Sequence, residues 1–242
     1  MKKKPLVTGV VRLYDDDTVI NKVVEQLFIG CDKVVVVLTG PCSESSIAKP
    51  LQEKVSFIED KRFFSSNSMS LQRIVDYFKS DPPDYLVYPD QDEILPAQWP
   101  SCINYLERCE KLLTCSFKFL TCWESIDTVL PTKCSYPLHH HCKISKWYKG
   151  IRFLPGQGYC FPSHMPQKAR HRSCWSIRHT ALMTARHREK FWSDEKRKAW
   201  RSNNRWKNSN FYKDLYSAIV FGVPKGVVPF EPNKKWQEYP RQ

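Results

Sequence analysis

The sequence has no long hydrophobic run, and this absence bears first on the membrane. No stretch reaches the roughly 18 consecutive apolar residues that a membrane-spanning helix requires. The basic start Met1–Pro5 is followed by an apolar run, Leu6–Val11, that is too short for a signal peptide and ends at Arg12. We therefore expect a cytoplasmic protein.

Cysteines at metal-binding spacing are also absent. The chain has 10 cysteines, but no two of them have the Cys-x-x-Cys spacing of ordinary zinc sites. Without a secretory route, we expect them to be reduced and buried as small hydrophobic side chains. The run from His139 to Cys142 suggests a zinc site, but neighbouring residues of a strand point in opposite directions, which favours an exposed polar run.

Acidic residues are few relative to basic ones. The 242-residue chain carries 38 Lys and Arg against 25 Asp and Glu, which gives a net charge of +13 and a pI near 9.3. Such a surplus favours a polyanionic partner, either nucleic acid or an anionic membrane surface. Residues 168–213 are especially basic and rich in Trp, Phe and Tyr, a combination that contacts phosphates and unstacked bases. A solvated helix whose aromatic residues pack on a sheet is the alternative for this segment.

The sequence does contain a regular alternation of strands and helices, and no internal repeat is evident. The predicted strands are Leu6–Val11, Lys33–Leu38, Val55–Ile58 and Tyr85–Tyr88, and the predicted helices are 19–28, 43–51 (stopped by Pro50) and 68–79. This order predicts an α/β fold with a mostly parallel sheet and helices on both faces. Further on, we expect a helix at 99–113, a strand at 116–122, and a loop-rich β region at 127–170 that shapes a pocket, with short strands near 143–145 and 150–154.

The last of the early strands runs into three carboxylates, those of Asp90, Asp92 and Glu93. In open α/β sheets, ligands bind at the carboxyl ends of the strands. If the strand continues, Asp90 and Asp92 point to the same face, and a cation such as Mg²⁺ or Mn²⁺ relieves the repulsion between them. A solvated acidic turn is the alternative, but a metal site for a phosphate-bearing substrate is favoured.

The order and spacing of four features resemble the glycosyltransferases of the GT-A fold, specifically the family-two-like group. The features are the strand and loop Val7–Tyr14, the strand and small-residue loop Val34–Ser46, the motif at 90–93 preceded by a helix carrying Arg73, and Ile177-Arg178-His179 before Met183, Thr184, Arg186 and Arg188. The resemblance covers residues 6–100 and, less continuously, 100–215. It implies a catalytic domain at 1–215, with a nucleotide-binding half (1–100) and an acceptor half (101–215), followed by an extension at 216–242 packed on it.

The resemblance implies an enzyme that moves a sugar from a nucleoside-diphosphate sugar to a hydroxyl group. Asp90 and Asp92 would hold Mg²⁺ or Mn²⁺ on the donor diphosphate, with His179 as a further ligand, and the ion would stabilise the departing diphosphate. A buried histidine bonded to backbone is the alternative for His179. The residues implied to line the donor pocket are Val11, Arg12, Tyr14, Thr39, Asp60, Arg73 and Asp90.

Two departures from the family pattern leave questions open. Many members place an Asp directly after the second strand, whereas Thr39 stands there, so the nucleotide is not specified. No catalytic base for inverting transfer is obvious: the available carboxylates are Glu93, Glu124 and Asp127, of which Glu93 and Asp127 are our candidates. Retaining chemistry needs no such base, so the stereochemical outcome also stays open.

The preferred acceptor is a hydroxyl on a modified base in DNA, as used by some phage-encoded transferases, reached through the basic segment 168–213. Such an enzyme would act in the host cytoplasm and would flip its target base out of the stack. A cell-surface glycan or lipid-linked acceptor is one alternative, with the basic face on anionic membrane. A nucleic-acid-binding protein without catalysis is another. A haloacid-dehalogenase-type phosphatase fits less well, because its Asp-x-Asp motif belongs on an early strand and an acidic pair should follow downstream.

Overall fold

The computed structural model describes residues 3–14, 19–39, 42–60, 67–130, 140–154, 161–180, 183 and 227–239. In chain order, the elements are β1 (Val7–Leu13), α1 (Ile20–Phe28), β2 (Lys33–Leu38), η1 (Glu44–Ser46), α2 (Lys49–Gln52), β3 (Ser56–Glu59), α3 (Asn67–Phe78), β4 (Tyr85–Val87), β5 (Glu93–Ile94), α4 (Pro100–Arg108), β6 (Thr114–Trp123), β7 (Ser125–Val129), β8 (His141–Lys146), η4 (Gln167–Ala169), β9 (Arg170–His179), β10 (Val228–Pro229) and η5 (Trp236–Glu238). The chain divides into two compact units, Met1–Phe117 with His139–Ser173, and Lys118–Leu138 with Cys174–Gln242.

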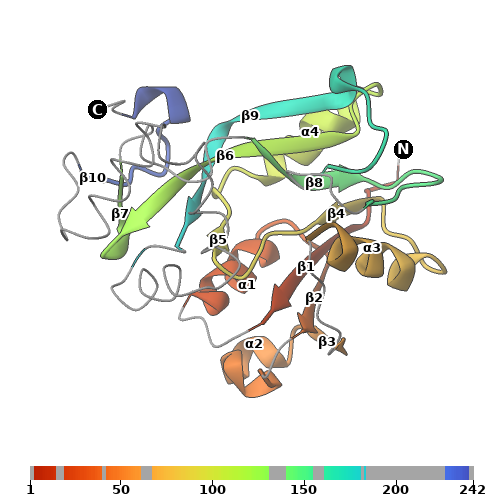
Figure 1. Cartoon of the computed structure of the whole chain (residues 1–242), viewed down its shortest axis with the longest axis horizontal. Coiled ribbons are helices and arrows are strands. Elements are labelled where there is room, and N and C mark those ends of the chain that lie inside the picture. The colour runs from red at the N-terminus through yellow and green to blue at the C-terminus, as the bar shows by residue number, and fades with distance from the viewer. Residues whose placement is uncertain are drawn as a thin grey trace, which may run out of the picture. The chain divides into compact units, whose positions relative to one another are not determined.

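Four parallel strands form the centre of the first unit, in the order β4-β1-β2-β3 (Figure 1). Almost every side chain of β1, β2 and β4 is buried, as expected for strands covered on both faces. The chain moves outward from β1 to β2 to β3, and then returns to place β4 on the other side of β1. The direction of winding therefore reverses between β1 and β4.

Helices cover the two faces of this sheet. Leu71, Val75 and Phe78 of α3 join one hydrophobic cluster with Val10 of β1. The neighbouring Gly9 points to the other face, where a Cβ on it would lie 3.0 Å from Leu27 Cδ2 of α1 and 2.8 Å from Cys31 Sγ. Glycine at this position thus lets α1 approach the sheet closely.

Antiparallel strands continue the sheet beyond β4. β8 pairs with β4, and the first residues of β6 pair with β8. The predicted GT-A-like α/β fold, with helices on both faces of its parallel strands, is confirmed.

The second unit has its own antiparallel strands, formed by the end of β6 with β7 and by β7 with β10. The guanidinium of Arg178, near the end of β9, lies 4.4 Å from the ring centroid of Phe230. Lys118 on β6 lies 4.7 Å from the ring centroid of Trp236. These cation–π contacts fix residues 227–239 against the strands of this unit.

Several local predictions were wrong. Pro50 lies in the first turn of α2 instead of stopping a helix, because the missing N–H of proline costs nothing there. The helix predicted at 99–113 ends at Arg108. Residues 150–154 form no strand, and Phe153 instead donates its N–H to the Gln72 side chain at 2.7 Å.

Some predictions fall wholly or partly outside the described residues. They are residues 131–139 and 155–160 of the loop-rich region, the segment 168–213 after residue 180 except Met183, and the extension 216–242 outside residues 227–239; Thr184, Arg186, Arg188 and His139 are among them. The predicted domain boundaries therefore stay predictions. Within the described ranges, no helix combines the length and the hydropathy needed to cross a membrane.

Candidate active site

The predicted donor residues of the first unit follow the carboxyl ends of the parallel strands. Thr39, just after β2, donates its N–H to Leu13 O at the end of β1, at 2.8 Å. Asp60, just after β3, donates its N–H to Leu38 O of β2 at 3.0 Å. Hydrogen bonds therefore continue from strand to strand and hold these positions in one row.

Arg12 and Asp90 meet where the winding reverses, between β1 and β4. Their backbones form a parallel bridge, and the Arg12 guanidinium donates to Asp90 Oδ1. The N–H of the following Tyr14 donates to Gln91 Oε1 at 2.7 Å. A reversal of winding opens a crevice between two strand ends, which is the usual ligand site of open α/β sheets.

Lys143 reaches the same turn from β8. Its Nζ lies 3.1 Å from Asp90 Oδ2 and 2.6 Å from Glu93 Oε2, and only 1% of its side chain is exposed. β8 carries it there because Tyr88, one residue beyond β4, donates its N–H to Lys143 O at 2.9 Å. A buried lysine needs such partners, since a desolvated charge without them is costly.

The four charges of this cluster balance. Arg12 and Lys143 supply two positive charges, and Asp90 and Glu93 supply two negative ones. Although burial acts to raise the pKa of Asp90, the charges of Arg12 and Lys143 outweigh that effect and hold this pKa well below its usual range. Asp90 is thus an ionised carboxylate held by two cations.

Glu93 is placed as a brace of the acidic turn. Its Oε2 accepts a hydrogen bond from the N–H of Asp90 at 2.8 Å as well as from Lys143, and its side chain is 3% exposed. A carboxylate that accepts a backbone N–H three residues earlier closes the turn on itself. Whether Glu93 also acts as a base stays a prediction.

The acidic motif differs in one respect from the sequence prediction. β4 ends at Val87, and Gln91 and Asp92 form a turn before the short strand β5. The argument that Asp90 and Asp92 share a face of a continuous strand therefore does not hold. Their order in the turn, not the strand period, sets their directions.

The fit of a divalent ion to this turn depends on the donor. Both Asp90 oxygens are already engaged by cations, and the described residues contain no group of three or more His, Cys, Asp or Glu that could hold a metal by itself. Mg²⁺, however, is commonly held by one or two carboxylates together with substrate phosphates. Asp92, half-buried in the turn, suits that smaller role.

The remaining donor candidates lie around this edge. Arg73 of α3 pairs with Asp60, with 3.4 Å between Nε and Oδ2. Tyr14 is 47% exposed at the end of β1, whereas Val11 is fully buried within the strand. The structure thus places an exposed ring at the end of β1 and a half-exposed guanidinium beside the end of β3.

Asp127 and His179 belong to the second unit. Asp127 is largely exposed and pairs with Arg178, with 3.7 Å between Nη1 and Oδ1. His179 is buried and stacks on Phe119, with ring centroids 5.3 Å apart. Their predicted roles as base and metal ligand stay predictions.

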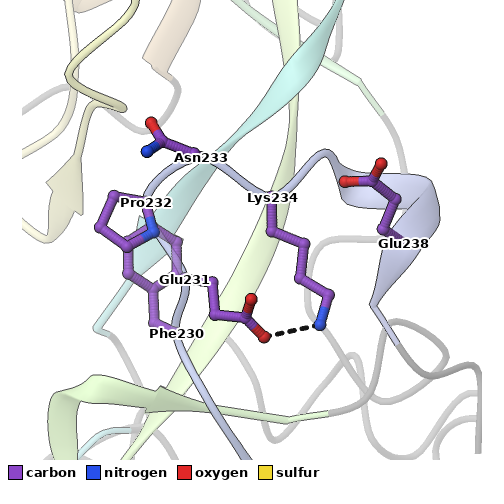
Figure 2. A pocket seen from close by; sticks show the side chains of 6 residues that line it. All are labelled: Phe230, Glu231, Pro232, Asn233, Lys234 and Glu238. Carbon is purple, nitrogen blue, oxygen red and sulfur yellow. Dashed lines mark hydrogen bonds and ion pairs between the residues drawn. The ribbon is translucent and has the colours of Figure 1, made fainter.

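The second unit also has a shallow hollow, at residues 230–238 (Figure 2). Across it, Lys234 Nζ pairs with Glu231 Oε1 at 2.7 Å. Glu238 lies at the other end and accepts the N–H of Lys235 at 2.6 Å. These contacts are local, and with Glu231 and Glu238 against Lys234 the lining carries one surplus negative charge.

Comparisons with known proteins give only remote structural likenesses. No family model and no curated protein matches the chain. Similar solved structures include TarS of S. aureus, at 11% identity over 91% of this chain and 49% of TarS, with a TM-score of 0.45. Another is glucosyl-3-phosphoglycerate synthase from Mycobacterium tuberculosis with Mg²⁺ and UDP, at 15% identity over 48% of this chain and 44% of the synthase, with a TM-score of 0.37.

A third similar structure is CMP:2-keto-3-deoxy-manno-octonic acid synthetase with CTP, at 13% identity over 58% of this chain and 74% of that protein, with a TM-score of 0.39. TarS has also been solved with UDP-GlcNAc. The chain spans less than half the length of TarS and of the mycobacterial synthase. Because all three TM-scores are below 0.5, the fold assignment rests on the strand order and not on these neighbours.

Sequence reasoning missed Lys143, the residue that neutralises the acidic turn. The only available signal was a lysine inside a strand-like piece, Cys142–Ser145, where a charge is unusual. Pairing that lysine with the turn requires the register of β8 on β4. These strands are far apart in the sequence, and nothing local specifies their register.

Proposed function

We propose that the chain is a glycosyltransferase that takes a sugar from a nucleoside-diphosphate sugar in the presence of Mg²⁺ or Mn²⁺. The observation that carries this proposal is the row of Arg12, Thr39, Asp60 and Asp90 along the carboxyl ends of four parallel strands. The row includes the reversal point between β1 and β4, where a nucleotide fits. The resemblance of the sequence motifs to the GT-A family supports the same assignment.

The charge balance supports the need for a divalent ion. Arg12 and Lys143 are already neutralised by Asp90 and Glu93, and Asp92 adds a further negative charge. A diphosphate arriving there would meet no positive surplus from these five residues. A divalent ion bound jointly by Asp92 and the phosphates would supply that charge.

In the proposed transfer, the acceptor hydroxyl oxygen forms a bond to the anomeric carbon. The bond from that carbon to the diphosphate oxygen breaks, and its electron pair leaves with the diphosphate. The hydroxyl proton passes to a base, for which Glu93 and Asp127 are the candidates, with His179 as a further phosphate or metal ligand. Arg12, Tyr14, Thr39 and Asp60 would hold the nucleotide, assisted by Arg73.

The proposed acceptor is a hydroxyl on a modified DNA base. A net charge of +13 supports a polyanionic partner. The same charge would suit an acceptor at an anionic membrane, and the experiment below separates the two.

The test measures donor hydrolysis by the full chain with a panel of nucleotide sugars, with Mn²⁺, Mg²⁺ or EDTA. We expect turnover of at least one donor with metal, and a loss of roughly 100-fold or more in Asp92→Asn, because the ion that offsets the diphosphate charge is then weakly held. Asp81→Asn, which changes an exposed carboxylate after α3, is the matched control and should keep full activity.

Three outcomes distinguish the hypotheses. Turnover stimulated by DNA carrying hydroxymethylated bases supports the DNA acceptor, whereas stimulation only by glycan or lipid-linked acceptors replaces it. The absence of any turnover, combined with no metal-dependent nucleotide binding, would falsify the transferase assignment. Salt-dependent DNA binding in that last case would leave a non-catalytic nucleic-acid-binding protein.

A further inference from the structure

A separate groove of about 990 Å³ lies along α3 in the first unit. One wall is formed by α3 from Gln72 on and by Lys79 just after its end, and the others by the turn 147–152 and the loop 163–166. Seven residues of α3 separate the first and last of these positions, which corresponds to about 10 Å along the helix axis. None of the donor residues described above lines this groove.

The groove carries positive charge that is not neutralised. Lys79, Lys149 and Arg152 line it and are exposed, and the described part of the chain provides no ion-pair partner for any of the three. Asp76 is the one carboxylate among its lining residues, and its Oδ1 accepts a hydrogen bond from Gln72 at 2.9 Å. This surplus is the opposite of the balanced cluster at Asp90.

Aromatic rings lie among these cations. Trp147 and Tyr148 line the groove and are half-buried, because each also packs against the hydrophobic cluster under α3. A ring anchored in this way loses little freedom when a ligand stacks on it. Cations beside anchored aromatic rings are the combination that binds single-stranded nucleic acid, through phosphates and bases respectively.

Backbone contacts shape the groove before any ligand arrives. Gly150 has φ +84°, a conformation that glycine adopts without strain, and it lets the chain turn between Tyr148 and Ile151. Ser163 donates its N–H to Arg152 O at 2.7 Å, and its Oγ accepts the N–H of Leu154 at 2.8 Å. The cationic turn is therefore tied to the opposite loop.

The groove lies beside the beginning of β4, where Trp147 donates its N–H to Asp84 O at 2.8 Å, and α3 connects it to the carboxyl edge of the sheet. Arg73 pairs with Asp60 at the carboxyl edge of the sheet, and the preceding Gln72 lines the groove. Neighbouring residues of a helix are rotated by about 100°, so one helix serves both sites. An extended acceptor strand of several nucleotides can therefore run along α3, with one part in the groove and its reacting base in the crevice.

We propose that this groove binds the single-stranded nucleic acid that flanks the acceptor base. Lys79, Lys149 and Arg152 contact phosphates, and Trp147 and Tyr148 stack on bases. The inference deepens the proposed function, on which its biological meaning rests, and it assigns the acceptor strand a site in the first unit outside the basic segment 168–213. A base flipped out for reaction leaves unpaired neighbours for such a site to hold.

The test is binding of a fluorescein-labelled single-stranded DNA dodecamer to the full chain, followed by fluorescence anisotropy at several salt concentrations. The groove variant is Lys79→Ala/Lys149→Ala/Arg152→Ala. The matched control, Lys54→Ala/Arg108→Ala/Lys111→Ala, removes three exposed cations of the same unit from outside the groove. Both variants should keep the thermal unfolding midpoint of the parent chain.

We expect the groove variant to lose at least tenfold in affinity at low salt, and the control to change less than threefold. The slope of log affinity against log salt should fall by about 2 in the groove variant, since each single-strand phosphate contact contributes about 0.7. Tyr148→Leu, which removes a ring without changing charge, should lower affinity for DNA several-fold but leave binding of inorganic polyphosphate unchanged. Equal losses in the groove and control variants would overturn the proposal.

Two further outcomes separate this proposal from the assignment of the enzyme. If Tyr148→Leu changes nothing and polyphosphate competes as well as DNA per phosphate, the groove binds anions without regard to bases and the nucleic-acid proposal is wrong. Donor hydrolysis without DNA should be unaffected in the groove variant. Absence of donor turnover in the parent chain would remove the transferase and leave the binding result standing.

Discussion

Two clusters of charge in the first unit differ in how far ion pairs neutralise their charges. At the acidic turn, Arg12 and Lys143 face Asp90 and Glu93. The most exposed of these four side chains, that of Asp90, is only 21% exposed. In the groove along α3, exposed cations have no such partners among the described residues. Both clusters contain basic side chains, so sequence composition alone does not distinguish them.

The presence of ion pairs at the acidic turn, and their absence among the described residues of the groove, indicate that the two clusters have different roles. Charges that are buried and balanced offer a ligand no net attraction, so their largest effect is to position backbone and neighbouring groups. Exposed charges without partners cost little to the fold and are available to a ligand of opposite sign. We therefore expect changes at the acidic turn to act on stability, and changes in the groove to act on binding.

The largest effect expected from this comparison is on stability, in Lys143→Met. Removing the lysine leaves the Asp90 and Glu93 carboxylates near each other with one cation fewer, and breaking such a buried pair costs about 3 to 5 kcal/mol. Urea unfolding measures the loss. Lys146→Met is the control, because its partner Glu107 lies 3.6 Å away and both side chains are substantially exposed, so its cost should stay below about 1 kcal/mol.

A second substitution tests the cause. If repulsion and desolvation of the carboxylates explain the loss, Lys143→Met/Glu93→Gln should regain part of the stability, because one buried charge is removed. A Lys143→Met variant no less stable than Lys146→Met would contradict the distinction between balanced and unbalanced clusters.

The sequence predicted most of the first unit because its signals are local. The valine run of β2 and the helical spacing of apolar residues in α1 each lie within ten consecutive residues. The structure has both elements where they were predicted. The prediction was wrong where the end of an element, or the absence of one, depended on tertiary contacts. Residues 150–154 have strand-like composition, but Gln72 of α3 holds Phe153 outside any sheet.

The site was predicted less completely, for a physical reason. Asp90 was recognised because a carboxylate at a strand end is visible in one short segment. Its partners Arg12 and Lys143 are 78 and 53 residues away, so their pairing depends on which strands lie beside β4 and in what register. The groove was missed as a site because its cations come from two segments that meet only in the fold.

A smaller effect should appear in the pH dependence of stability. The pKa of Asp90 is held below its ordinary value of 3.8 in the folded chain, so the unfolded chain binds a proton there more readily. The resulting stability is fully present above pH 4 and is lost as the pH falls toward the lowered pKa. Between pH 4 and pH 2, the unfolding free energy of the parent chain should therefore fall more steeply than that of Asp90→Asn.

Urea titrations at a series of pH values measure this difference. Asp81→Asn, which removes an exposed carboxylate with no cation beside it among the described residues, should leave the slope of the parent chain unchanged. Parallel curves for the parent chain and Asp90→Asn would show that the cations do not favour the ionised form of Asp90.

The smallest effect on stability should come from Arg73→Gln, on the helix α3 that forms one wall of the groove. Arg73 is 41% exposed and lies 3.4 Å from Asp60, so solvent screens the pair and its loss should change the unfolding free energy by less than about 0.5 kcal/mol. If Arg73 serves the donor, the KM for the nucleotide sugar should nevertheless rise several-fold with little change in kcat, because the contact is made equally in the ground and transition states. Arg108→Gln, an exposed arginine at the end of α4, should alter neither quantity. If Arg73→Gln leaves KM unchanged but lowers the affinity for single-stranded DNA, Arg73 belongs to the groove and not to the donor site.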